Sequence, residues 1–138
     1  MLIPRKVKYR KSHRGDQIKG QAVRKIALSF GSFGLKTLEA GWITSRQIES
    51  SRRAITGYLQ RKGKVWIRIF PDKSVTVKGN EIRMGGGKGA VDHYVAPVRP
   101  GTILFEVDGV TLAEARISLR LAAHKLPVKT IVVSKTTS

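Results

Sequence analysis

The sequence has no cysteine and few acidic residues, and these two shortages limit what the protein can be. With no cysteine among its 138 residues, the chain cannot form disulfides, use a thiolate nucleophile or bind zinc through sulfur. Only 9 Asp and Glu oppose 27 Lys and Arg, which gives a formal net charge of +18. Small soluble domains do well with a net charge of about 2–8 in magnitude, so this excess predicts a polyanionic partner.

Long apolar runs are also missing. No run approaches the roughly 20 residues that a membrane-spanning helix requires, and the basic N-terminus lacks the apolar stretch of a signal peptide. We therefore expect nucleic acid rather than a membrane surface as the polyanion, and an intracellular setting. A free DNA-binding or membrane-binding module stays as an alternative.

Residues suited to catalysis or metal binding are scattered. The three histidines are His13, His93 and His124, and no metal-ligand spacing relates them. Asp92 and His93 are neighbours on an expected strand, where they would point to opposite faces. We expect Glu106, Asp108 and Glu114 at turns and helix caps. The sequence predicts no catalytic residue, metal or cofactor, with an RNA-acting or nucleotide-acting enzyme as the alternative.

Residues 1–27 predict a basic, extended N-terminal arm. Within 1–25, nine basic residues face the single acid Asp16, and Gly15 and Gly20 interrupt the few apolar positions. An aromatic among cations can stack on an exposed base while its neighbours hold phosphates. The RNA-binding candidates here are Arg5, Lys6, Lys8, Tyr9, Arg10, Lys11 and Arg14. The alternative is a solvated tail.

Residues 28–138 predict one α+β domain with a mixed or mostly antiparallel sheet. Two helices are expected, at 44–63 and from Thr111 to about Lys125, each opened by a capping-box pattern. Gly63 is the expected stop of the first helix. The expected strands are 64–72, 74–78, 80–84, 91–98, 102–108 and 127–134.

The apolar residues predict what is buried. We expect the rings of Phe30 and Phe33 in the core. In the second helix, Ile117 and Leu121 lie opposite the main apolar stripe, which implies that this helix is covered on more than one face. The buried face of the first helix is expected at Ile48, Ile55 and Leu59.

The opposite face of the first helix is cationic and favours contact with phosphates over simple solvation. Glu49 is its only acid, too little for pairing within the helix. The candidate RNA-binding residues of this helix and the turn after it are Arg46, Arg52, Arg53, Arg61, Lys62 and Lys64.

The glycine-rich loop at 83–90 raises the question of whether the chain binds a nucleotide. A phosphate-binding P-loop requires Ser or Thr after the lysine and a following helix, but Lys88 precedes Gly89 and a strand-like run. The composition of the loop instead favours a basic, finger-like segment that faces RNA. The alternative is an ordinary surface turn. Its members are Arg83, Met84, Gly85, Gly86, Gly87, Lys88 and Gly89. Positive charge spread over the arm, the helix and the loop is typical of a protein that binds folded RNA. A DNA-reading protein would usually show a recognisable DNA-binding motif, and the sequence has none.

Seven strings in order along the chain resemble one protein family. They are "MLIPRKVKYRKSHRG" (1–15), "SFGSFGLK" (29–36), "ITSRQIESSRRAI" (43–55), "GKVWIRIFPDK" (63–73), "RMGGGKGA" (83–90), "RPGTILFEVDGV" (99–110) and "LAAHKLPVKT" (121–130). Together they are similar to the bacterial and organellar L-sixteen family of large-subunit ribosomal proteins.

This resemblance implies an α+β fold of the hammerhead type and a place in a cytoplasmic or organellar ribosome. It implies binding to large-subunit ribosomal RNA near the aminoacyl-tRNA site, contact of the glycine-rich loop with tRNA, neighbouring ribosomal proteins as partners, and a role in late subunit assembly. Arg83 stands where some bacterial members carry a hydroxylated arginine. Gly86 stands where the family usually has lysine, which removes one cation from the loop.

Overall fold

A computed structural model describes residues 2–3, 27–76 and 91–135. Within these ranges the chain forms two helices and seven strands, which confirms the expected α+β class. In chain order they are β1 (Phe33–Thr37), β2 (Gly41–Thr44), α1 (Ser45–Leu59), β3 (Lys64–Ile67), β4 (Lys73–Thr76), β5 (Val91–Val98), β6 (Ile103–Asp108), α2 (Leu112–Ala123) and β7 (Thr130–Ser134). The basic arm and the glycine-rich loop lie almost wholly outside the described residues.

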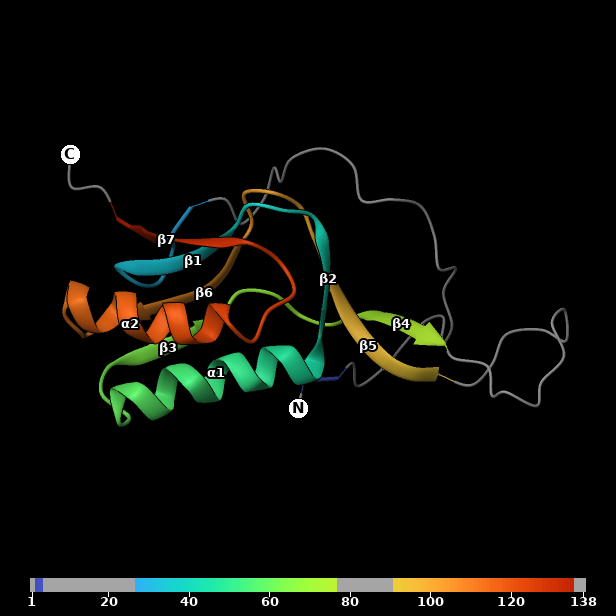
Figure 1. The fold of residues 1–138 in the computed structure, drawn as a ribbon, viewed down its shortest axis with the longest axis horizontal. Helices are drawn as coiled ribbons and strands as arrows, with labels where there is room; N and C mark the ends of the chain where they lie inside the picture. Colours follow the sequence, from blue (N-terminus) through green and yellow to red (C-terminus); the bar gives the residue numbers. More distant parts are fainter. Residues whose placement is uncertain (1, 4–26, 77–90, 136–138) are drawn as a thin grey trace, which may run out of the picture.

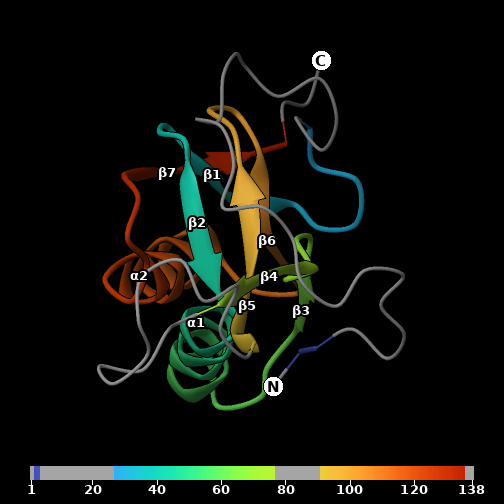
Figure 2. The ribbon, with the colours of Figure 1, turned by 90° about the vertical axis from the view of Figure 1, so that its right-hand side faces the viewer.

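The strands form two antiparallel sheets. One has four strands in the order β3-β6-β1-β7, and the other has three in the order β2-β5-β4 (Figures 1 and 2). The sequence predicted one mixed or mostly antiparallel sheet; the described strands pair antiparallel throughout, in two sheets rather than one. The division arises where the chain leaves β1, which pairs with β6 and β7, and enters β2, which pairs with β5.

The core lies between the two helices and one face of the four-stranded sheet. Helices α1 and α2 pack against each other on that face (Figure 1). Ile48, Ile55 and Leu59 of α1 are buried there, as the sequence predicted. A register shift after Leu35 lets the neighbours Leu104 and Phe105 of β6 both join the core.

Both helices begin at the predicted caps. Thr44 and Thr111 each accept a backbone N–H from the third helical residue, whose side chain accepts in return. The predicted stop at Gly63 is wrong, because α1 ends at Leu59. Gln60 and Arg61 adopt left-handed backbone angles, with φ of 51° and 66°, and so turn the chain before the glycine is reached.

The outward face of α2 differs from the prediction. Ile117 and Leu121 are 42% and 39% exposed, so within the described chain this face is not covered. The error arose because apolar residues on a second face of a helix were taken to require a covering layer within the same chain.

Residues 27–31 cover the face of the four-stranded sheet opposite the helices. A Cβ at Gly34 would lie 2.4 Å from the Leu28 side chain, and one at Gly31 would lie 2.5 Å from the Val107 carbonyl oxygen. Glycine at these two positions therefore permits the close approach. The prediction that Phe30 enters the core is wrong, since this ring is 56% exposed, whereas Phe33 packs partly buried against the core.

The predicted strands differ from the observed ones mainly in length. The strand expected at 64–72 ends at Ile67, and the one expected at 127–134 begins at Thr130. The strand 91–98 and the Pro100-Gly101 turn are confirmed; Gly101 has a φ of 98°. The strand expected at 80–84 lies outside the described residues.

Candidate nucleic-acid interface

The outward face of α1 presents arginines from a firmly anchored helix. The Thr44 cap fixes where the helix starts, and burial of Ile48 and Ile55 fixes its rotation about its own axis. Arg46 and Arg53 are consequently exposed, while Arg52 is half-buried. We call these three residues, Arg46, Arg52 and Arg53, the α1 basic face.

One carboxylate serves two of these arginines. The expectation that one acid is too little for pairing within the helix is wrong, since Glu49 pairs with Arg52 and, at 3.2 Å, with Arg53. The hydrogen bond from Arg52 is the main reason that the pKa of Glu49 is lowered, and the same bond raises the pKa of Arg52. Because one negative charge faces two positive ones, the α1 basic face keeps a net positive charge.

The turn after α1 continues the cationic surface. Arg61, Lys62 and Lys64 are exposed, and within residues 2–3, 27–76 and 91–135 none forms an ion pair under 4.0 Å. Lys62 lies close enough to Glu114 of α2 to help lower the pKa of that carboxyl, whose main partner is the Thr111 N–H. The structure thus brings these three cations to the end of α1, where they suit the negative helix terminus as well as phosphate.

On the other side of the four-stranded sheet, the exposed ring of Phe30 lies beside Trp66 and Arg68. Phe30 stacks on Trp66, with ring centroids 5.9 Å apart and planes 20° apart. The Arg68 guanidinium carbon lies 5.2 Å from the centre of the Phe30 ring. An exposed ring beside a cation is the kind of surface on which an unpaired base stacks.

A buried carboxylate holds this arrangement in place. Oε1 of Glu106 accepts the backbone N–H groups of Ser29, Phe30 and Gly31 at 3.0, 2.9 and 2.9 Å, and Oε2 pairs with Arg68. We call this set of contacts the Glu106 clamp. The prediction of an ordinary turn or surface role for Glu106 is wrong, since the residue is fully buried.

Electrostatics favour the charged form of Glu106. Burial by itself would raise its pKa, but the hydrogen bond from Gly31 and the bond from Arg68, together with the Phe30 amide, lower it below the ordinary value. The clamp therefore keeps a carboxylate ionised in the protein interior. It also fixes the direction in which the chain leaves the domain toward the arm, since Arg68 additionally donates to the Ala27 carbonyl oxygen.

Three further acids, Glu39, Asp108 and Glu114, are held by internal contacts. Glu39 accepts the Lys129 N–H, Asp108 accepts the Ser32 hydroxyl, and Glu114 caps α2. Acidic charge is in any case too scarce to neutralise the exposed cations, since 9 Asp and Glu oppose 27 Lys and Arg. An anionic partner would supply the missing counter-charge.

The histidine and acid expected to point apart lie together. His93 Nδ1 is 2.6 Å from Asp92 Oδ2, so the prediction that they would face opposite ways is wrong. Side-chain torsions let neighbours at a solvent-facing strand position reach each other. In the part of the chain that the structure describes, no three acidic or histidine side chains group to hold a metal ion, and no helix is long and apolar enough to cross a membrane.

The structure describes some of the predicted RNA-binding residues and not others. Those of α1 and its following turn lie on one continuous stretch of chain, whereas those of the arm and the glycine-rich loop lie outside the described residues. Sequence reasoning did not select Phe30, Trp66 or Arg68. The alternation in "VWIRIF" held the signal, because Val65 and Ile67 face the core and leave Trp66 and Arg68 on the opposite side.

Comparison with known proteins gives one consistent result. The sequence profile described as ribosomal protein L16p/L10e matches residues 4–133. A large ribosomal subunit protein uL16c of Ostreococcus tauri is 58% identical over 130 residues, covering 94% of this chain and 92% of that protein. The uL16 protein of Oenococcus oeni is 57% identical over 135 residues, covering 98% and 94%. A uL16c protein of Thalassiosira pseudonana is 58% identical over 130 residues, covering 94% of each chain.

Proposed function

The chain belongs to the ribosomal protein L16p/L10e family, and from that premise we propose that it binds large-subunit ribosomal RNA near the aminoacyl-tRNA site, contacts tRNA and supports late subunit assembly. As a member of this family it is a structural component of the large ribosomal subunit and not an enzyme. Ribosomal RNA and other ribosomal proteins are accordingly its partners.

The observation that carries RNA binding is the imbalance of exposed charge. The net charge is +18, while Glu49, Glu106 and Glu114 are engaged with groups inside the domain. RNA can replace the small counterions that such a surface collects, and their release drives binding. The exposed Phe30 ring adds a surface for an unpaired base beside these charges.

The three basic elements have different tasks in this proposal. The arm and the α1 basic face bind RNA backbone, which positions the protein without reading sequence. Glycines at 85–87 and 89 let the loop backbone approach a crowded partner, and Arg83 and Lys88 supply its charge. Loop contact with tRNA is supported by the family resemblance and by this composition.

Salt dependence tests the RNA contact. The affinity of the full chain for a large-subunit ribosomal RNA fragment should fall by about 10³–10⁵ between 50 and 200 mM salt if roughly 6–10 phosphates are neutralised. A variant with Arg46, Arg53 and Arg61 changed to Gln should show a shallower slope. An affinity that does not change with salt would contradict the proposal.

A second experiment separates the loop from the fold. Replacing Arg83 and Lys88 by Ala should reduce tRNA binding by assembled subunits while leaving thermal unfolding of the free chain unchanged. The control replaces Arg99 and Lys125 by Ala; these are two exposed cations outside the proposed contacts. An equal effect of both double variants on tRNA binding would argue against a specific loop contact.

Retention on the particle tests the partner class. The protein should sediment with large subunits through a salt wash that removes loosely bound basic proteins. Release into the supernatant together with a generic basic control protein would favour a free nucleic-acid-binding module instead.

A further inference from the structure

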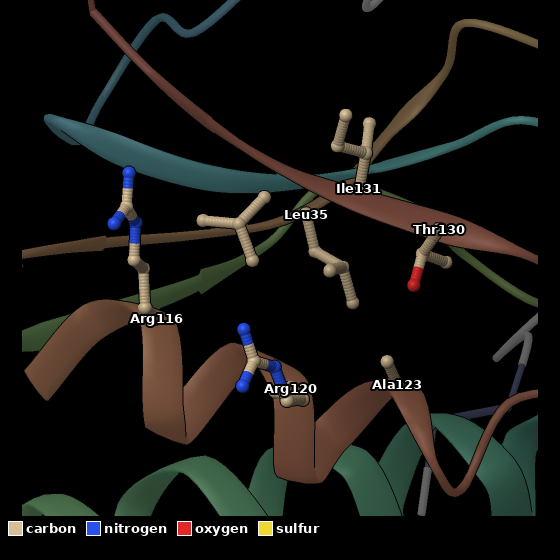
Figure 3. Close-up of a pocket in the computed structure, with 7 residues that line it drawn as sticks. Leu35, Arg116, Arg120, Ala123, Thr130 and Ile131 are labelled. Atoms are coloured by element: carbon tan, nitrogen blue, oxygen red, sulfur yellow. The ribbon is translucent and has the colours of Figure 1, made fainter. Parts of the chain in front are cut away.

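A groove of about 320 Å³ lies between α2 and the β1–β7 side of the four-stranded sheet (Figure 3). It is separate from the α1 basic face and from the Phe30 stack. Its lining combines two guanidinium groups with a mainly apolar floor. The lining residues are Leu35, Arg116, Arg120, Ala123, Thr130, Ile131 and Val132.

Two arginines of α2 border this groove one helical turn apart. Arg116 and Arg120 extend from successive turns of α2 toward the sheet (Figure 3). Neither side chain forms an ion pair or hydrogen bond with any other described residue. Like charges four residues apart on a helix repel each other, and an anion between them would turn that repulsion into attraction. Two guanidinium forks match the oxygens of a phosphate group.

The floor gives the groove a second recognition element. Leu35 and Val132 belong to paired positions of β1 and β7, and Ala123 closes the groove from the helix side with a small side chain. An inorganic phosphate gains nothing from such a floor, whereas the ribose and base of a nucleotide can pack on it. Pockets that hold small organic groups have volumes of about 300–1,000 Å³, and this groove lies at the lower end of that range.

From these observations we infer that the groove binds a single nucleotide of RNA. Its phosphate lies between Arg116 and Arg120, and its sugar and base contact Leu35, Ala123 and Val132. This inference rests on the proposed RNA binding and adds a specific site to it, on a helix that sequence reasoning had not assigned to RNA. The basic charge of the whole chain favours a polyanion over an isolated acidic side chain of a protein.

Paired charge-removing variants test the arginines. Replacing Arg116 and Arg120 by Gln should weaken binding of the ribosomal RNA fragment about tenfold and lower its salt slope by about 1, the change expected for one lost phosphate contact. The matched control replaces Lys125 and Lys135 by Gln. These two exposed cations do not line the groove, so the control removes the same charge and should weaken RNA binding less. Equal losses in the two double variants would overturn the site.

A floor variant tests the groove without changing charge. Ala123→Leu fills the space with methyl groups and keeps a residue that favours helix. It should weaken RNA binding while leaving the salt slope unchanged, because the guanidinium groups remain. Unchanged affinity in a variant with normal thermal unfolding would count against insertion of a nucleotide.

The absence of native cysteine permits a direct footprint. In a Thr130→Cys variant, whose side chain points toward α2 (Figure 3), a maleimide should react more slowly when the RNA fragment is bound, whereas Ala113→Cys on the exposed side of α2 should react at the same rate. RNA binding without protection of residue 130 overturns the groove and leaves the proposed function intact. No RNA binding at all overturns the proposed function as well. Equal protection of residue 130 by a glutamate-rich peptide would identify a protein partner and overturn the nucleotide.

Discussion

One face of the four-stranded sheet packs against α1 and α2, and the opposite face is covered by residues 27–31. On the helix side the contacts are apolar, from Leu35, Phe105 and Val107. On the other side, the central contact is the ionised Glu106, bound by three amides and Arg68. The same sheet is thus stabilised by hydrophobic burial on one side and by charge-assisted hydrogen bonds on the other.

The difference explains which parts of the domain can present groups to a partner. The apolar face must be closed, because its stability depends on exclusion of water. The clamp closes the other face with a short segment of backbone, and the side chain of Phe30 is left outside. A rigid backbone that carries an exposed ring is suited to binding, since little freedom is lost when a base stacks on it.

The largest effect is expected on the apolar face. Phe105→Ala removes a fully buried ring and should lower the free energy of unfolding by about 3–5 kcal/mol, measured by urea denaturation. The loss should be the same at pH 7 and at pH 4, because no ionisable group is removed. Ile117→Ala, on the exposed face of α2, serves as the control and should change stability by less than about 0.5 kcal/mol. Similar losses in the two variants would contradict the assignment of the core.

Glu106→Gln should have the next largest effect and differ in its pH dependence. The amide keeps the shape of the side chain but loses the charge that binds Arg68 and three N–H groups, so we expect a loss of about 2–3 kcal/mol at pH 7. The control Glu114→Gln changes a carboxyl in the α2 cap, and its effect on stability should be smaller.

The sign of the pH effect follows from the lowered pKa of Glu106. A carboxyl that is more acidic in the folded state contributes its stabilisation above the unfolded pKa of about 4.3, and loses it as pH falls through the folded value. The gap in stability between wild type and Glu106→Gln should therefore be constant from pH 7 to about 5 and shrink at lower pH. A gap that widens on acidification would disprove an ionised Glu106.

Sequence reasoning succeeded where the determining interactions are local. The caps at Thr44 and Thr111 depend on residues three positions away, and the buried face of α1 depends on helical spacing. The Pro100-Gly101 turn likewise requires only two residues in order. These features could be read without knowing the partner strands.

Features that depend on distant residues were missed. Glu106 binds amides 75 to 77 positions away, and no local pattern marks it as buried. The outward turn of Phe30 follows from those same bonds, and the groove at Arg116 and Arg120 requires β7 to lie beside α2. The α1 basic face could be predicted because it lies on one helix, whereas the Phe30 stack joins two separate segments.

Phe30→Ala should separate binding from stability on the clamped face. The ring is 56% exposed, so its loss should lower the free energy of unfolding by about 1 kcal/mol or less, through the lost contacts with Trp66 and Arg68. Affinity for the ribosomal RNA fragment should fall by about 1–3 kcal/mol if a base stacks there. Phe30→Tyr keeps the ring and should keep the affinity. Equal affinity of Phe30→Ala and wild type would remove this ring from the interface.

The smallest change in stability is expected at Arg53, on the far side of the helices from the sheet. Its side chain is 74% exposed and shares Glu49 with Arg52, so Arg53→Gln should alter the free energy of unfolding by less than about 0.5 kcal/mol. The slope of RNA affinity against salt should nevertheless fall by about 1, because one phosphate contact is lost. Arg53→Lys keeps the charge and should keep the slope. If Arg53→Gln left the slope unchanged, the outward face of α1 would be a solvated surface, and RNA contact in the described domain would have to come from the clamped face and the α2 groove.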